Sequence, residues 1–313
     1  NGHYRYKKTA VFSYSIEEDE VLESFTQKGI DDSLLTVQHF HFPNGNKELS
    51  YSIGEYKDAK IEKQDRMTFL SKEEGGQTFL VGISDLDCEP SGKIILSVTK
   101  EPKSFFITYW KGDSQLIAKT KQLTRDSLDR LLGISGALSS MTKGSPNLQW
   151  DHELTGKGEL ANPKDFKTAY VIDTLPVPVI NPYKSPMVLS GIAFDSSGDA
   201  YVSTMFGDVW KVSGIGGNLD KIVWKRMIAG LNSPFGLTWH EGVLYVGDKA
   251  ELISLHDLNG DDEFDFVERV NQEYRPMHRN VHAGAPMDSK GAFYYVTAGG
   301  VKKLFNDKVE LLS

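Results

Sequence analysis

The amino-acid sequence predicts an all-β protein, in which a β-sandwich-like domain precedes a partial β-propeller and one short helix lies between them. Three observations lead to this fold class. The N-terminal part consists of short strand-like runs separated by turn residues. One segment has helical periodicity. The C-terminal part repeats one strand pattern about every 45 residues, the spacing of four-stranded propeller blades. The length of 313 residues fits two domains.

Residues 1–122 form the predicted sandwich-like domain. The runs TAVFSYSI (9–16), LLTVQHFHF (34–42) and SFFITYW (104–110) are rich in β-branched and aromatic residues and alternate only in part. Turn residues such as Lys111-Gly112-Asp113 separate the runs. Several short antiparallel strands at this spacing are typical of a sandwich.

Residues 123–186 are predicted to hold the helix and a Pro-rich linker. The helix spans 123–142, where Thr124 is the expected N-cap and Leu128, Leu131 and Leu132 recur at near-helical spacing. Six prolines then follow between Gly144 and Pro186. Such a stretch favours an extended linker that drapes over a neighbouring domain.

Residues 187–313 are predicted to form propeller blades. Three segments begin at Gly191, Gly236 and Gly284 with a short apolar strand, a polar turn that closes on a second glycine, and an aromatic strand. A blade cannot bury its two faces alone and must stack on its neighbours. Because closed propellers have about four to eight blades, we expect an incomplete propeller and a chain that is a fragment of a longer protein.

Composition excludes several classes of function. The 43 acidic residues outnumber the 35 Lys and Arg residues and give a net charge of -8, which argues against a nucleic-acid partner. No apolar stretch approaches the roughly 20 residues of a membrane span. Cys88 is the only cysteine, so internal disulfides, four-thiolate zinc sites and covalently attached haem are excluded.

One acidic segment matches a calcium-binding loop. Oxygen-bearing side chains recur at every second residue from Asp257 onward, a spacing that lets a tight loop fold around one hard cation. The predicted ligands are the side chains of Asp257, Asn259, Asp261, Asp265 and Glu268, and Glu263 through its backbone carbonyl. Asp262 stands where such loops normally have glycine, and the flanks look like strands. The alternative is a solvated acidic turn held by Asx hydrogen bonds.

The segment VHAGAPMDSKGAFYYVTAGG, from Val281 to Gly300, resembles the histidine-containing blade of the soluble pyrroloquinoline-quinone-dependent sugar dehydrogenases. The resemblance implies that His282 is the general base that takes the proton of the substrate hydroxyl while hydride passes to the quinone. Arg275 and Arg279 would meet the quinone carboxylates, since guanidinium groups pair with carboxylates bidentately. The alternative is a blade-edge histidine that is hydrogen-bonded to the backbone.

A wider resemblance covers most of the chain. VFSYSIEEDEVLES, FGDVWKVSGI, IAGLNSPFGL and LHDLNGDDEFDFVE together resemble a bacterial family of large envelope proteins, the membrane-bound dehydrogenase-like or haem-domain proteins. The resemblance implies a periplasmic or extracellular module that oxidises a sugar or small alcohol. It also implies a c-type cytochrome, in the same protein or a partner, that takes the electrons.

A second class of function stays open, namely a non-catalytic carbohydrate- or protein-binding module in glycan utilisation. The sandwich-plus-propeller layout and the lack of a complete catalytic motif favour it. Tryptophans could stack on sugars, although Trp210 and Trp239 lie inside predicted blade strands, where core roles are expected.

Overall fold

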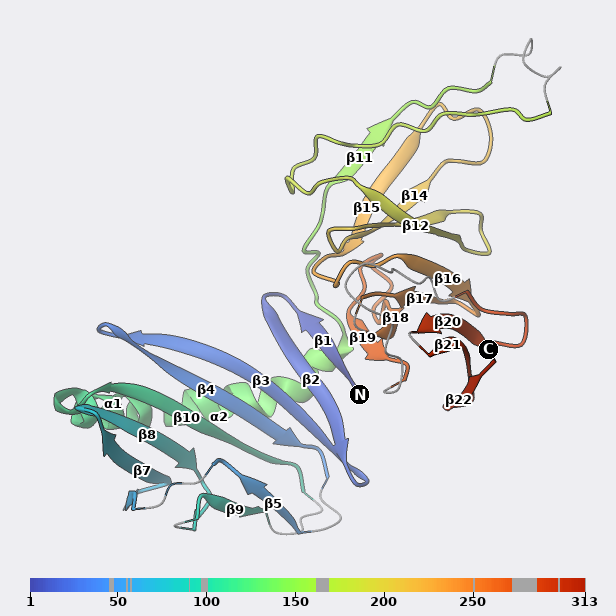
Figure 1. The fold of residues 1–313 in the computed structure, drawn as a ribbon. Helices are drawn as coiled ribbons and strands as arrows, with labels where there is room; N and C mark the ends of the chain where they lie inside the picture. The colour runs from blue at the N-terminus through green and yellow to red at the C-terminus, as the bar shows by residue number, and fades with distance from the viewer. Residues whose placement is uncertain are drawn as a thin grey trace. The chain divides into compact units, whose positions relative to one another are not determined.

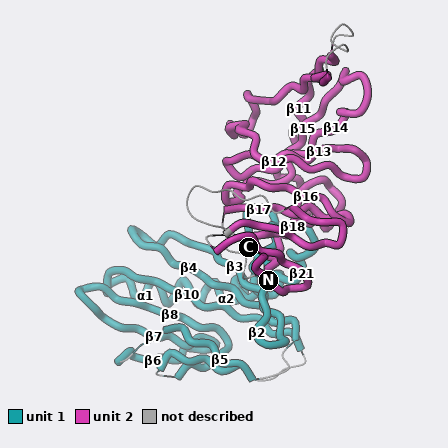
Figure 2. The backbone as a smooth tube through the Cα atoms, turned by 45° about the vertical axis from the view of Figure 1, so that its right-hand side comes forward, with its two compact units in different colours: residues 1–144 teal, residues 145–313 magenta. Residues whose placement is uncertain are grey.

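The structure is a computed structural model in which the chain is mostly β (Figure 1). It describes residues 1–44, 48–54, 56, 58–89, 91–96, 101–161, 169–249, 251–271, 286–297 and 299–312. The chain divides into two compact units, Asn1–Gly144 and Ser145–Ser313 (Figure 2). The all-β class with a short helical segment is therefore confirmed.

The first unit is built on one antiparallel sheet, whose strands pair in the order β1-β2-β3-β4-β10-β8-β7-β6. The strands are β1 (Gly2–Tyr6), β2 (Thr9–Ile16), β3 (Asp19–Ile30), β4 (Ser33–Phe42), β6 (Lys60–Gln64), β7 (Met67–Glu74), β8 (Gln77–Ser84) and β10 (Lys103–Asp113). Strands β5 (Leu49–Ser52) and β9 (Lys93–Leu96) form a separate pair.

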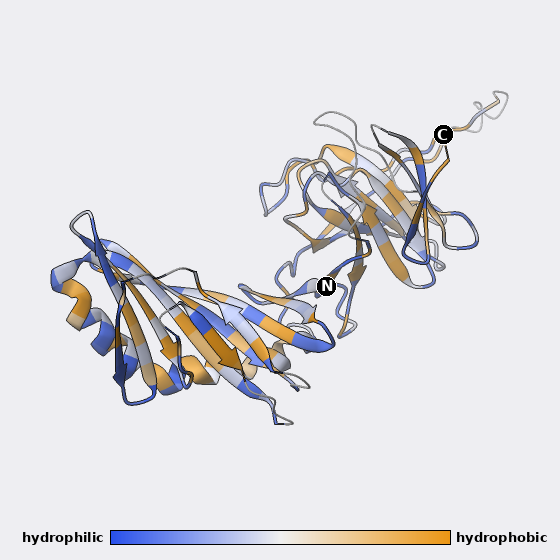
Figure 3. Cartoon of the chain, turned by 60° about the horizontal axis from the view of Figure 1, so that its bottom comes forward, coloured by the Kyte–Doolittle hydropathy of each residue, from blue (hydrophilic) through white to orange (hydrophobic). Residues whose placement is uncertain are grey.

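Both faces of this sheet are covered, which explains why its central strands alternate only in part. On β10, Phe105 and Ile107 pack toward one face together with Ile94 and Leu96 of β9. Phe106 and Trp110 pack toward the other face, which helices cover. Figure 3 shows apolar residues on the strands and on the helices of this unit. The predicted sandwich is thus a large sheet between two unequal covers, a two-stranded pair and a helical layer.

The helical layer starts earlier than predicted and is broken. The 3₁₀ turn η1 (Ser114–Leu116) leads into α1 (Ile117–Asp126), α2 (Leu128–Ala137) and the 3₁₀ helix η2 (Leu138–Lys143). Thr124 is not an N-cap, because its hydroxyl lies inside α1 and donates to the Thr120 carbonyl at 2.9 Å. Asp113 caps the segment instead and accepts the backbone N–H of Gln115 at 2.8 Å. The helices belong to the first unit.

The described residues of the second unit form three antiparallel meanders. Meander 1 comprises β12 (Leu189–Phe194), β13 (Ala200–Thr204), β14 (Val209–Ser213) and β15 (Ile222–Ile228), with β11 (Glu153–Gly156) added at its edge. Meander 2 comprises β16 (Gly236–His240), β17 (Val243–Gly247), β18 (Leu252–His256) and β19 (Phe266–Arg269). Meander 3 comprises β20 (Phe293–Thr297), β21 (Gly300–Phe305) and β22 (Lys308–Leu311).

The meanders stack face to face, as the repeat requires. Tyr201 and Val209 of meander 1 share a core with Leu244 and Val246 of meander 2. The opposite face of meander 2 packs through Leu252 against meander 3. Part of the Pro-rich stretch, through Leu175, Val177, Tyr183 and Met187, packs on the outer face of meander 1. That stretch therefore belongs to the second unit.

Candidate metal centre

The predicted calcium loop connects β18 to β19 in meander 2. Its backbone turns back on itself at Gly260 and Asp262, which have φ of +76° and +63°. Left-handed backbone is the natural place for glycine, and aspartate is one of the few other residues that adopt it readily. The tight turn therefore forms although Asp262 replaces the expected glycine.

The Asp257 carboxylate organises this turn. Its Oδ1 accepts the backbone N–H of Gly260 at 2.7 Å and, at 3.3 Å, those of Asn259 and Asp261. Its Oδ2 accepts the backbone N–H of Asp262 at 2.9 Å. These are the Asx hydrogen bonds expected if the segment is a solvated acidic turn that binds no ion.

Three carboxylates meet in this loop. One oxygen from each of Asp257, Asp261 and Asp265 lies within 4.8 Å of the others. Burial is the main cause that raises the pKa of Asp265, and the charges of Asp261 and Asp257 raise it further. A divalent cation would offset this repulsion. Hard cations such as Ca²⁺ prefer carboxylate and amide oxygens, so the donor set fits calcium.

The other predicted ligands have different roles. Asn259 accepts the backbone N–H of Asp261 at 3.1 Å and donates to the Ser145 carbonyl at 2.8 Å. Glu268 lies on β19, where its carboxylate is 3.4 Å from both Ser254 Oγ and His256 Nε2. The Glu268 carboxylate does not belong to the group of three carboxylates.

Glu263 holds the start of the second unit. Its buried carboxylate accepts the backbone N–H of Gln149 at 2.8 Å and that of Trp150 at 2.6 Å. Burial raises the pKa of Glu263, and the two backbone hydrogen bonds lower it. The Asp265 carboxylate also accepts the backbone N–H of Ser145 at 3.0 Å. The acidic loop thus fixes residues 145–150, whether or not it binds an ion.

The loop also bridges meanders 1 and 2. Lys211 of meander 1 lies 3.1 Å from Asp262, and Lys225 of the same meander donates to the Asp261 carbonyl at 2.6 Å. These contacts join the tip of the loop to the neighbouring sheet. A metal ion at the centre would therefore stabilise an interface as well as a turn.

A buried ion pair in meander 1 was not predicted. Asp208, which is almost fully buried, accepts hydrogen bonds from Arg226 and Ser185. The Arg226 guanidinium lies 4.9 Å from the ring centre of Tyr183 and 5.5 Å from that of Trp150. An arginine within an apolar strand and an aspartate in a neighbouring turn are the only sequence signals of this cluster.

The residues that the sequence assigned to quinone chemistry, His282, Arg275 and Arg279, lie outside the described residues. The expectation that tryptophans of the blade strands have core roles is met: Trp210 is fully buried and Trp239 stacks on Tyr201. Within the described residues, no helix is long and apolar enough to cross a bilayer.

Comparisons with known proteins add little. No protein-family model and no curated protein matches the chain. A solved structure from Bacteroides uniformis, described as a 6-phosphogluconolactonase, is similar at 9% identity with a TM-score of 0.28. The alignment covers 93% of this chain and 66% of the solved one. A likeness this weak carries no argument about function.

Proposed function

We propose that the second unit is a sugar- or alcohol-dehydrogenase-like propeller module of a larger envelope redox protein. The stack of three consecutive antiparallel meanders carries the proposal, because it is the blade arrangement that the sequence resemblance implies. The resemblance also implies a location in the periplasm or outside the cell and a c-type cytochrome as the electron acceptor.

In this proposal His282 takes the proton from the substrate hydroxyl, and Arg275 and Arg279 pair with the carboxylates of the cofactor. Pyrroloquinoline quinone, when bound, supplies the hydride acceptor. The calcium ion of the loop has a separate role. Asp257, Asp261 and Asp265 would hold it, and it would stabilise meander 2.

A dye-linked oxidation assay tests the proposal. The larger protein that contains this chain is mixed with Ca²⁺ and pyrroloquinoline quinone and offered a panel of aldoses and primary alcohols. We expect dye reduction with at least one substrate and its loss in His282→Gln. His240→Gln, on β16, is the matched control and should retain turnover. If no substrate reduces the dye although the cofactor binds, the dehydrogenase proposal is wrong.

One observation favours the second candidate, a carbohydrate-binding module. Phe12 on β2 and Phe25 on β3 are exposed and meet edge to face, with ring centres 6.3 Å apart. Exposed aromatic rings on a sheet can stack on the apolar faces of sugars. Binding to a glycan array that Phe25→Ala weakens, without any dye reduction, would support this function instead.

A further inference from the structure

A cavity of about 390 Å³ lies in the first unit, between the helical layer and strands β3 and β4. Thr26 and Lys28 on β3 pair across the strands with Val37 and Leu35 on β4. Val37 and Leu35 belong to the core on the face of the sheet that the helices cover (Figure 1), so Lys28 lies on that face too. The helical side of the cavity is lined by residues at helical spacing, namely Leu123, Ser127, Arg130 and Ile134.

Three donors in this cavity have no acceptor among the residues that the structure describes. They are the side chains of Lys28, Ser127 and Arg130. The other hydroxyl and amide side chains of the lining are hydrogen-bonded within the protein. No Asp or Glu lies among the described residues that line the cavity. Lys28 and Arg130 are exposed, so they stand at the mouth of the cavity, where a ligand can reach them.

The carboxylates nearest to Arg130 along the chain have other partners. Asp126 accepts a hydrogen bond from Gln122 Nε2 at 2.7 Å, and Asp129 accepts one from Arg66 Nη1 at 3.2 Å. Two positive charges therefore share one cavity, and the described lining residues supply no counter-charge. A bound anion would offset their repulsion.

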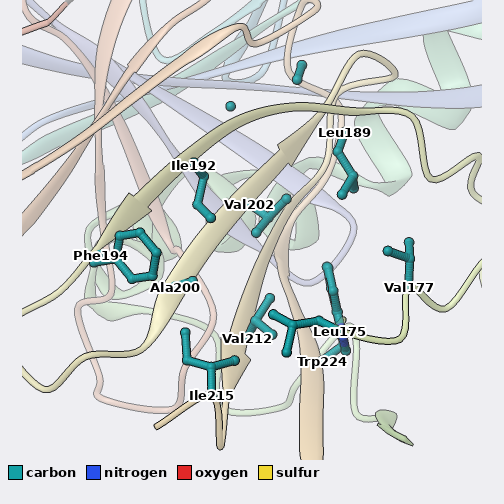
Figure 4. Close-up of a pocket in the computed structure, with 12 residues that line it drawn as sticks. Leu175, Val177, Leu189, Ile192, Phe194, Ala200, Val202, Val212, Ile215 and Trp224 are labelled. Atoms are coloured by element: carbon teal, nitrogen blue, oxygen red, sulfur yellow. The ribbon is translucent and has the colours of Figure 1, made fainter. Parts of the chain in front are cut away.

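The floor of the cavity is apolar. It is formed by Leu35, Val37 and Leu131, which are almost fully buried, and by Leu123 and Ile134, which are half-buried. Such a floor favours contact with a hydrocarbon group. The cavity of about 360 Å³ on meander 1 differs, because none of the residues that line it is charged (Figure 4). The cavity of the first unit thus combines an apolar floor with cations that suit an anionic head group.

We propose that this cavity binds a small organic carboxylate. The Arg130 guanidinium holds the carboxylate in the bidentate geometry of this pair, Lys28 supplies the second positive charge, and Ser127 Oγ is a neutral donor. The hydrocarbon part of the ligand packs on the apolar floor. This site goes beyond the redox function proposed for the second unit, and either of the two can fail without the other.

Isothermal titration calorimetry of the 313-residue chain with hexanoate tests the site. Hexanoate should bind more tightly than acetate, which lacks the hydrocarbon chain, and than 1-hexanol, which lacks the charge. Arg130→Gln and Lys28→Gln should each weaken hexanoate binding about tenfold, the effect of losing a hydrogen bond to a charged group. Lys119→Gln is the matched control and should bind as the wild type does, because Lys119 on α1 pairs with Asp31 at 2.7 Å outside the cavity.

His39 reports whether the carboxylate lies at Arg130. Its Nε2 is 2.9 Å from Oγ1 of Thr26, which lines the cavity. Burial is the main cause that lowers the pKa of His39, and the charge of Arg130 lowers it further. Because a carboxylate on Arg130 offsets that charge, an NMR titration should give a higher pKa of His39 with hexanoate than without it. Arg130→Gln should remove this difference.

The proposal is wrong if hexanoate binds in neither measurement, if 1-hexanol binds as tightly, or if Lys119→Gln weakens binding as much as Arg130→Gln does. Tighter binding of hexyl phosphate than of hexanoate would overturn the carboxylate assignment in favour of a phosphate ester. Urea unfolding without ligand should be the same for the wild type and the variants, since the substituted side chains are exposed. A loss of binding is then distinguished from a loss of fold.

Discussion

His39 on β4 is fully buried and contacts α2, so it links the sheet to the helical layer of the first unit. Its Nε2 lies 2.9 Å from Thr26 Oγ1 and its Nδ1 lies 3.0 Å from Ser135 Oγ. Ser135 in turn donates to the Leu131 carbonyl at 3.2 Å. Each of these side-chain polar atoms has a hydrogen-bond partner. The network can therefore be buried as long as the His39 ring is neutral.

This burial makes the stability of the first unit depend on pH. Burial lowers the pKa of His39 from 6.5 to about 4, so the unfolded chain binds a proton more readily than the folded one between these values. The free energy of unfolding should therefore fall as the pH drops from 6.5 toward 4, by up to about 3 kcal/mol. His41, whose pKa burial also lowers, acts in the same direction.

Urea unfolding at several pH values between 7 and 4 measures this dependence. His39→Gln should be less stable at pH 7 and should lose most of the slope. His152→Gln, at an exposed position, should leave the slope unchanged. An identical slope in wild type and His39→Gln would mean that another group causes the acid sensitivity.

At the scale of single elements, the acidic loop offers a direct test of calcium binding. If Asp257, Asp261 and Asp265 hold Ca²⁺, the ion should raise the free energy of unfolding of the second unit by about 2.7 kcal/mol at one hundred times its dissociation constant. Asp261→Asn should abolish this gain and, in EDTA, should not destabilise the loop, because it removes one of three repelling charges.

Thermal unfolding in EDTA and in excess Ca²⁺ makes the comparison. Asp262→Asn is the control from the same loop, since Asp262 pairs with Lys211 and lies outside the three-carboxylate group. It should keep the calcium-dependent shift in melting temperature. Equal melting temperatures of the wild type in EDTA and Ca²⁺ would leave the loop as an Asx-bonded turn that needs no ion.

The loop also shows how far sequence reasoning reaches. Asp257, Asp261 and Asp265 could be grouped in advance, because ligands four residues apart in one tight loop must meet locally. The spacing predicts only a backbone-carbonyl ligand at Glu263 and gives no role to its carboxylate, which accepts the backbone N–H groups of Gln149 and Trp150, more than a hundred residues away. The repeat predicted the meanders because each one is a local unit. The Asp208–Arg226 pair joins a turn to a strand eighteen residues later and has no local signature.

At the scale of the whole molecule, the division into two units differs from the one that composition indicated. The change from strand-like to helical residues near 122 predicted a domain boundary there, but the helices complete the core of the first unit. Leu128, Leu131 and Leu132 pack with Phe106 and Trp110 on one face of the sheet. The structure places the division after Gly144 instead.

The piece 1–144 should therefore fold alone, and the piece 1–122 should not. The shorter piece ends within α1 and lacks α2, so it exposes the apolar sheet face and leaves His39 without Ser135.

Trp110 is the only tryptophan in either piece and is almost fully buried, so its fluorescence reports this face directly. We expect one cooperative transition and blue-shifted emission for 1–144, and neither for 1–122. Within 1–144, Leu131→Ala should cost about 2–5 kcal/mol by leaving a cavity. A cooperative transition of 1–122 at the same temperature would show that the sheet and its two-stranded cover form a domain without the helices.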